Sequence, residues 1–356
     1  MTIIQHRYRM SFHTPAFLGN AEQSGQWRTP AIKALIRHWW RVAYWASSTG
    51  TFDIRAMRRT EGDLFGLAAD GDETGSRQSQ LRIRLSHWNV GKQKTWVGLD
   101  SGGVRHPEVE KSKSISPQLY LGFGPLTYDK QIRQTQLNKG AALEGGEEAV
   151  LALAFPDGKE RLRLEQALSL LNFLGTLGGR SRNGWGSLTL APEDDTPDLK
   201  ATLPPQMLRD WREALALDWP HAVGRDKLGP LIWHTDNLPD WHAVMKRLAE
   251  IKISLRTQPA FAFQGKPSGQ AEPRHWLSYP VTNHDVVEWK RNNRRLPNTL
   301  RFKVRPTAQG QLQGLIYHMP CQPPPEFQPT FKILEEVWTH VHQHLDALKH
   351  LHRLSA

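Results

Sequence analysis

Residues 178–188 read GGRSRNGWGSL, and this stretch separates two segments with different periodicities. Before it, leucines recur at three- and four-residue spacing over residues 162–177, a pattern that is typical of an amphipathic helix. After it, residues 187–190 alternate between polar and apolar side chains, as a short strand does. The sequence therefore predicts a helix that ends at glycines, continues into an exposed basic loop and then enters a strand.

The composition of this glycine loop, residues 178–188, suits the binding of phosphate. Glycine adopts positive φ and lets another backbone approach closely, and consecutive loop amides can form an anion-binding nest. The guanidinium groups of Arg180 and Arg182 present paired donors that match phosphate geometry. In the alternative interpretation, Gly178 and Gly179 only cap the helix and the arginines are solvated. A nucleotide-binding P-loop is excluded, because GxxxxGK[ST] is absent and the helix precedes the strand.

The first half of the chain predicts an α+β fold of the ferredoxin-like kind. Thr29 and Pro30 mark a helix start, with threonine as the N-cap and proline at the first helical position. The order of patterned segments is strand, helix, strand, strand, helix, strand. This order is that of the split βαβ unit and of RNA-recognition domains. The segments are residues 3–17, 31–46, 80–90, 149–155, 162–177 and 187–190.

The first predicted helix carries a second basic feature. Lys33, Arg37 and Arg41 follow one another at four-residue spacing, which places three cations along one helix face. Like charges at this spacing repel by a few tenths of a kcal/mol per pair, so the pattern favours an anion lying on that face. A solvated helix face is the alternative.

Two domains are expected, at residues 1–195 and 205–356, because residues 191–206 are acidic and rich in proline, as linkers often are. The second domain is also predicted to be α+β, with long loop insertions in both domains at 91–117 and 264–280. Its predicted helices cover 239–249 and 331–351, its predicted strand 250–256, and its predicted hairpin 300–304 and 314–319.

The net charge of the chain favours a polyanionic partner. Among 356 residues, 46 Lys and Arg face 35 Asp and Glu, which gives a formal net charge of +11. Such an excess suits phosphate neutralisation and counterion release. One cysteine, Cys321, excludes an intrachain disulfide and a cysteine metal cluster. No apolar run reaches the roughly 18 residues that a membrane span needs, so a cytoplasmic protein is expected.

The sequence supports no catalytic or metal site. The motifs HExxH, GxSxG and CxxC are absent. His340 and His344 share a predicted helix face, but no third ligand accompanies them. His13 is the one candidate general base for a ribonuclease, and no partner lies near it in the sequence. We therefore predict no catalytic residue, no metal and no cofactor.

Several stretches together resemble the RAMP superfamily of CRISPR proteins, and more narrowly the first-numbered subunit of the type III-B (Cmr) RNA-targeting complex. The glycine loop is similar to the one that many RAMP proteins share, while the helix that contains WWR narrows the resemblance to this subunit. The stretches are TPAFLGNAEQSGQWRTPAIKALIRHWWR at 14–41, DLFGLAADGDETGSRQSQLRIRLSHW at 63–88, LGGRSRNGWGSL at 177–188 and RLPNTLRFKV at 295–304.

The resemblance implies tandem ferredoxin-like (RRM-like) RAMP domains that bind RNA without cutting it, near the 3′ end of the guide. The implied partners are CRISPR guide RNA, target RNA and neighbouring RAMP subunits. His38 departs from the family pattern, which usually has an aromatic or apolar residue there. The implied RNA contacts are Lys33, Arg37, Arg41, Gly178, Gly179, Arg180, Ser181, Arg182 and Asn183.

Two other functions stay open from the sequence. One is a metal-independent RAMP endoribonuclease that processes CRISPR RNA and uses His13 as its base. The other is a scaffold that binds only proteins through its 14 tryptophans, a residue type enriched at interfaces. The family resemblance attributes target cleavage to an aspartate in a different subunit, and no segment here aligns with it.

Overall fold

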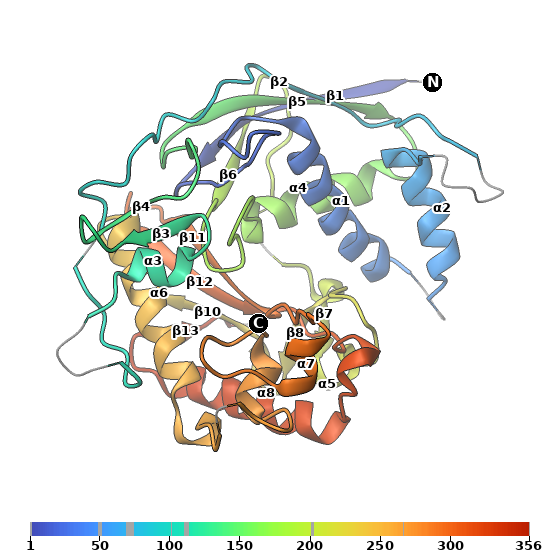
Figure 1. Cartoon of the computed structure of the whole chain (residues 1–356). Helices are drawn as coiled ribbons and strands as arrows, with labels where there is room; N and C mark the ends of the chain where they lie inside the picture. The colour runs from blue at the N-terminus through green and yellow to red at the C-terminus, as the bar shows by residue number, and fades with distance from the viewer. Residues whose placement is uncertain are drawn as a thin grey trace.

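The first sheet of the computed structural model has four antiparallel strands in the order β2-β5-β1-β6. They are β1 (Ile3–Phe12), β2 (Arg82–Leu85), β5 (Glu148–Pro156) and β6 (Leu188–Glu193). The helices α1 (Thr29–Ala46) and α4 (Arg161–Leu174) connect them and lie together on one face of the sheet (Figure 1). This is the ferredoxin-like arrangement, in which the last strand pairs beside the first.

The second sheet repeats this topology. It is ordered β11-β12-β10-β13 and contains β10 (Ile232–Thr235), β11 (Leu300–Pro306), β12 (Leu312–His318) and β13 (Leu351–Arg353). The helices α6 (Trp241–Arg256) and α8 (Phe331–Ala347) supply the two helical connections. The predicted α+β fold with two tandem ferredoxin-like units is confirmed, and the hairpin predicted at 300–304 and 314–319 is present.

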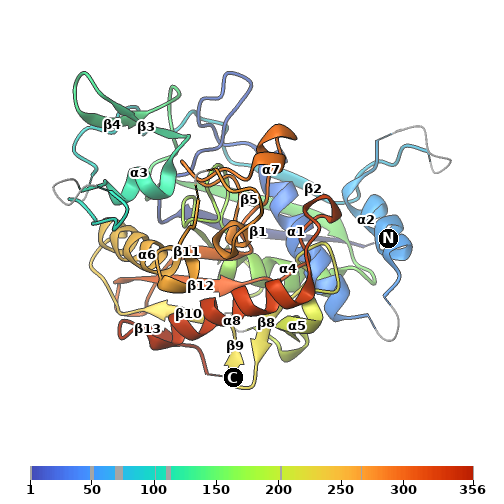
Figure 2. The same ribbon diagram turned by 60° about the horizontal axis from the view of Figure 1, so that its bottom comes forward.

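Smaller elements surround the two sheets. Figures 1 and 2 both show α3, β3 and β4 gathered at one side of the molecule, next to α6. The smaller elements are α2 (Ile54–Phe65), α3 (Pro117–Gly122), β3 (Leu126–Asp129), β4 (Gln134–Leu137), η1 (Pro205–Met207), β7 (Leu208–Asp210), α5 (Trp211–Ala214), β8 (Val223–Asp226), β9 (Gly229–Pro230), η2 (Pro259–Phe261), η3 (Pro273–Leu277), α7 (Val287–Arg291) and η4 (Pro325–Phe327).

The structure describes residues 2–48, 52–68, 75–100, 102–109, 114–200, 203–265 and 267–355. Within them, no helix has both the length and the apolar character needed to cross a membrane.

The predicted domain boundaries at 195 and 205 stay a prediction. Both hydrophobic cores draw on both halves of the sequence: Leu315 and Tyr317 join the core under the first sheet, while Trp96 and Trp185 join the core of the second.

Several predicted boundaries were wrong. Residues 250–256 continue α6 instead of forming a strand, because Ile251, Ile253 and Leu255 are all buried in a helix that is covered on several sides. The terminal helix ends at Ala347, and the strand β13 follows it. The N-cap of α1 is Arg28 rather than Thr29, although Pro30 lies in the first turn as expected.

The helix α2 was missed, and it matters for the site. Its start is set by Asp53, whose side chain accepts hydrogen bonds from the amides of Arg55 and Ala56. Glycines and acids are frequent at residues 61–75, a composition that is typical of a loop. The structure instead extends α2 to Phe65 and buries Glu61 against α1; residues 69–74 of the predicted loop lie outside the described part.

Candidate nucleic-acid interface

The glycine loop follows α4 and has a backbone that only glycine accommodates at two of its positions. Gly178 has φ 102°, and a Cβ there would lie 2.8 Å from the carbonyl oxygen of Phe17. Gly186 has φ 62°, and its Cβ would lie 1.8 Å from the carbonyl oxygen of Leu177. Real Cβ atoms do not approach backbone oxygens this closely, so both positions require glycine. The loop is therefore a tightly packed structure and more than a simple helix cap.

The backbone amides of this loop are mostly occupied. The amide of Gly179 donates to Phe17, that of Asn183 to Arg180, and that of Gly184 to Ser181. The amide of Phe302 on β11 donates in turn to the carbonyl oxygen of Arg182, at 3.0 Å. Because donors at alternating positions are already used, these amides form no continuous anion nest. Anion binding here must rely on side chains.

The two arginines of the loop have different neighbours. Arg180 has a left-handed φ of 56°, and its Nε donates to the carbonyl oxygen of Phe123 beyond α3, at 2.6 Å. Partial burial lowers the pKa of Arg182, and the charge of Arg301 on β11 lowers it further. The positive charge of Arg180 acts instead on Lys252 of α6. Both residues are exposed overall although burial lowers the pKa of each guanidinium group, and each arginine is near a different basic cluster.

The cluster on the side of Arg182 joins the loop to α1 through His38. Nη1 of Arg301 donates to Nε2 of His38 at 2.9 Å. Burial holds the pKa of His38 well below its usual range, and the charges of Arg301, Arg182 and Arg41 lower it further. A neutral imidazole can accept this hydrogen bond, whereas an imidazolium cannot. We name the set Arg41, His38, Arg182 and Arg301 the basic junction.

The cationic stripe of α1 is present, but α2 partly neutralises it. Arg41 donates two hydrogen bonds to the carboxylate of Glu61, from Nε at 2.8 Å and from Nη2 at 2.6 Å. Nε of Arg37 lies 3.1 Å from the same carboxylate, and Nη2 donates to the carbonyl oxygen of Gly66 at 3.1 Å. Burial lowers the pKa of Lys33, and the charge of Arg37 adds to this effect. One carboxylate thus offsets part of the predicted anion surface.

The sequence decides which family this arrangement belongs to. The RAMP superfamily profile matches residues 9–189, a stretch that runs from β1 through the glycine loop into β6. The chain belongs to the RAMP superfamily. No curated protein matches the sequence.

Solved structures with some similarity to this chain were also found. Cmr1 from Pyrococcus furiosus in its apo form has a TM-score of 0.44 and 13% identity over 91% of this RAMP chain and 90% of that chain. A chain of the type III-B Cmr-beta complex bound to cognate target RNA has a TM-score of 0.43 and 11% identity over 96% and 100%. A chain of a type IV-B CRISPR complex has a TM-score of 0.31 and 15% identity over 60% and 100%.

The structure brings the predicted loop residues together with α1, but through residues that the sequence reasoning did not select. Arg301 and His38 connect the two predicted groups in this RAMP chain, whereas Lys33 has no hydrogen bond or ion pair to another described residue. The alternation of Leu300, Phe302 and Val304 with three cations on β11 could have indicated Arg301. Contact of the predicted residues with RNA stays a prediction.

His13 lies in an environment that keeps it neutral. Its Nε2 lies 2.8 Å from Oγ1 of Thr189 on β6. Burial lowers the pKa of His13 to about 4, and the charge of Lys303 on β11 contributes in the same direction. The ammonium group of Lys303 is itself buried and donates to the carbonyl oxygen of Asn172 at 2.6 Å. In this RAMP chain His13 therefore lies at the contact between the two halves.

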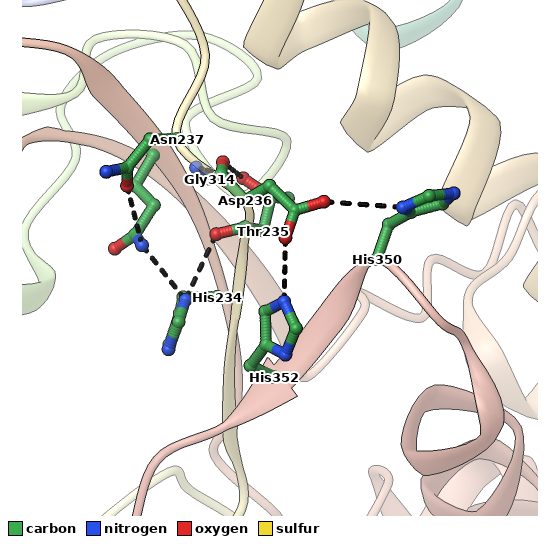
Figure 3. Close-up of polar contacts among 8 residues, drawn as sticks. His234, Thr235, Asp236, Asn237, Gly314, His350 and His352 are labelled. Carbon is green, nitrogen blue, oxygen red and sulfur yellow. Dashed lines mark hydrogen bonds and ion pairs between the residues drawn. The ribbon is translucent and has the colours of Figure 1, made fainter.

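The histidines near the C-terminus stabilise the second sheet. Figure 3 shows His350 and His352 directed at Asp236, with distances of 3.3 Å to Oδ2 and 2.7 Å to Oδ1. These contacts fasten β13 to the end of β10. His344 is paired with Ser254 of α6 instead, at 2.8 Å. Over the described ranges, no group of three or more His, Cys, Asp and Glu could hold a metal ion.

Proposed function

We propose that this RAMP chain is a non-catalytic RNA-binding subunit of a type III-B CRISPR (Cmr) effector complex. It binds guide or target RNA near the 3′ end of the guide and contacts neighbouring RAMP subunits. The basic junction carries the proposal: two arginines from different halves of the chain lie near one partly buried neutral histidine beside the glycine loop. The sequence resemblance at 14–41, where the WWR helix lies, favours this subunit among RAMP proteins.

The chemistry of the junction suits an RNA backbone. Burial lowers the pKa of Arg182, and the charge of Arg301 lowers it further because like charges close together repel. A phosphate between them would supply that counterion and accept paired guanidinium hydrogen bonds. Among the described residues no carboxylate forms an ion pair with either arginine, so protein acids do not compete for this position.

The alternative functions receive less support. A ribonuclease would need His13 to reach a ribose hydroxyl, yet His13 is half-buried and bonded to Thr189. A scaffold that binds through tryptophan needs exposed indoles, and Trp39, Trp40 and Trp185 are buried in the cores. Trp88 is exposed at 59% and is available for a protein contact.

The decisive experiment is RNA binding by Arg182→Ala with Arg301→Ala, measured as a function of salt. Each lost phosphate contact should reduce the slope of log K against log salt by about 0.7 for single-stranded RNA. The matched control is Arg7→Ala with Arg9→Ala, which removes the same charge from a part of β1 where both arginines pair with acids. If both double variants bind RNA equally well, the junction is not the RNA site. Defined cleavage of repeat RNA by the purified protein would replace the proposal with the ribonuclease.

A further inference from the structure

A second group of cations contacts the glycine loop through Asn183. Lys252 and Arg256 are one turn apart on α6, the helix that Figures 1 and 2 show beside α3. Nζ of Lys252 donates to Oδ1 of Asn183 in the loop, at 2.8 Å, and lies 5.8 Å from the centre of the Tyr120 ring on α3. Arg180 faces the same region, since its charge acts on Lys252.

These cations have no acidic partner among the described residues. Nη1 of Arg256 donates to the hydroxyl of Ser278 at 2.9 Å, and only 8% of this arginine is exposed. Neither Lys252 nor Arg256 forms an ion pair with a described carboxylate. Glu108 lies nearby but is engaged by Arg274, whose Nε is buried without a hydrogen-bond partner. The group as a whole therefore carries an uncompensated positive charge.

Such an arrangement is unfavourable unless an anion is added. Removing a cation from water without an opposite charge costs several kcal/mol. Burial and the charges of Arg256 and Arg180 accordingly lower the pKa of Lys252 to about 7. An anion beside them would stabilise the charged form of Lys252 and offset the charge of Arg256.

We propose that Arg180, Lys252 and Arg256 form a phosphate subsite that takes a phosphate group of the RNA strand. The subsite lies across the glycine loop from the basic junction, and this inference rests on the proposed function. Lys252 retains two donors beyond its bond to Asn183, and Arg256 retains most of its five. Oxygens of one phosphate can accept hydrogen bonds from both of these residues and from Arg180.

The two clusters together define how the strand passes. Arg180 and Arg182 flank Ser181 and have different neighbours: the charge of Arg180 acts on Lys252, whereas Arg182 is affected by Arg301. The RNA backbone therefore crosses the loop at Ser181, with one phosphate on the side of Arg301 and the other on the side of Lys252.

The test is Lys252→Met, which removes the charged amine while keeping an unbranched side chain that is one atom shorter. Its RNA affinity should fall about tenfold or more, as expected for a lost charge-assisted hydrogen bond. The salt slope should fall by about 0.7. The matched control is Lys246→Met on the same helix, a residue that makes no hydrogen bond or ion pair with a described residue. Lys252→Gln provides a second variant should the methionine disturb folding, which the thermal midpoint reveals.

Inorganic phosphate supplies a second readout that does not involve RNA. Binding to the native state raises the thermal midpoint, so phosphate should stabilise the wild type and Lys246→Met more than Lys252→Met, which keeps only the basic junction. If Lys252→Met and Lys246→Met both bind RNA with the affinity and salt slope of the wild type, the subsite is overturned and the proposed function remains. In another outcome, the wild type does not bind RNA, but phosphate raises its thermal midpoint more than that of Lys252→Met. This outcome would overturn the proposed function and support the subsite.

Two RNA oligonucleotides distinguish the source of the phosphate. One ends in a 3′-hydroxyl and the other in a 3′-phosphate, with identical sequence. If Lys252→Met loses the same affinity for both oligonucleotides, the subsite binds an internal phosphodiester. If it loses affinity only for the oligonucleotide with the 3′-phosphate, the subsite binds a terminal phosphate. Either result supports the subsite, whereas no loss with both, and no phosphate shift that depends on Lys252, overturns it.

Discussion

Nη1 of Arg301 on β11 lies 2.9 Å from Nε2 of His38 on α1, so a strand of the second sheet and a helix of the first share one hydrogen bond. The imidazole accepts in its neutral form, because burial and three nearby arginines hold its pKa well below the usual range. The departure of His38 from the RAMP pattern thereby gains a structural reason: it positions Arg301 next to Arg182.

We expect His38→Phe to weaken both folding and RNA binding. Phenylalanine fills the space but accepts no hydrogen bond, and the free energy of unfolding should fall by about 1–3 kcal/mol because a donor of Arg301 is left without a partner. Urea titration measures this loss. His38→Gln restores an acceptor and should recover most of it; a glutamine variant as unstable as the phenylalanine variant would contradict the role given to this bond.

Glu61→Gln should separate stability from RNA affinity. Losing the carboxylate removes the ion pairs with Arg37 and Arg41, whose side chains are 35% and 42% exposed, so solvent screening limits the destabilisation to about 1 kcal/mol. The same change frees positive charge on α1, and RNA should bind more tightly at low salt with a steeper salt slope. Filter binding at several salt concentrations measures this effect. Weaker RNA binding in a folded Glu61→Gln protein would show that the stripe of α1 is no anion surface.

Gly186→Ala should prevent the glycine loop from forming. The added Cβ would lie 1.8 Å from the carbonyl oxygen of Leu177, and φ is 62°. The matched control is Gly310→Ala in the turn between β11 and β12, where φ is 75° but no heavy atom lies within 4 Å of the added Cβ. Strain alone costs about 1–2 kcal/mol, so the control should lose that much and Gly186→Ala considerably more. Thermal unfolding compares the two, and equal midpoints would show that the loop can open at no extra cost.

Stability should decline below pH 6.5 because of a buried histidine pair. Nδ1 of His318 lies 2.9 Å from Nε2 of His342. Burial lowers the pKa of His342 to about 3, and that of His318 falls well below its usual range. As pH falls, these two histidines therefore bind protons in the unfolded chain at pH values where they stay neutral in the folded chain. The stabilising effect is complete above pH 6.5 and is lost as pH falls toward the folded pKa values, by about 2 kcal/mol per histidine between pH 6.5 and 5.

The variant His342→Gln checks this pH dependence. Its unfolding free energy should fall less steeply between pH 6.5 and 5 than that of the wild type. His340→Gln, at an exposed position of the same helix, serves as the control and should leave the slope unchanged. Identical slopes in all three proteins would mean that the pair is protonated without penalty.

Periodicity was sufficient for the first ferredoxin-like unit, because α1, β5 and α4 each bury one regular face. It failed where burial was uniform. Ile251, Ile253 and Leu255 alternate along the sequence, yet all are buried in α6, so a helix resembled a strand. The three-residue strand β13 was too short to carry a pattern and was hidden behind α8.

The candidate site was predictable in its parts but not in its connections. The glycines and arginines of the loop stand out locally, as does the spacing of Lys33, Arg37 and Arg41. Glu61 neutralises part of the positive charge of these residues. It lies on α2, a helix whose glycine and acidic residues are typical of a loop. Arg301 reaches the loop only through the pairing of β11 with residues 182 and 183, a contact between distant segments that no local pattern encodes.

The hydrogen bond from the amide of Phe302 to Arg182 sets an order of events during synthesis. The strands and helices of the first sheet are complete once β6 has left the ribosome, and domains fold as units in that order. The glycine loop acquires its final shape only after β11 has been translated and has docked against it. A chain released early would lack Leu315 and Tyr317 from the core under the first sheet as well as the strand that completes the glycine loop, so truncated copies should not sequester RNA.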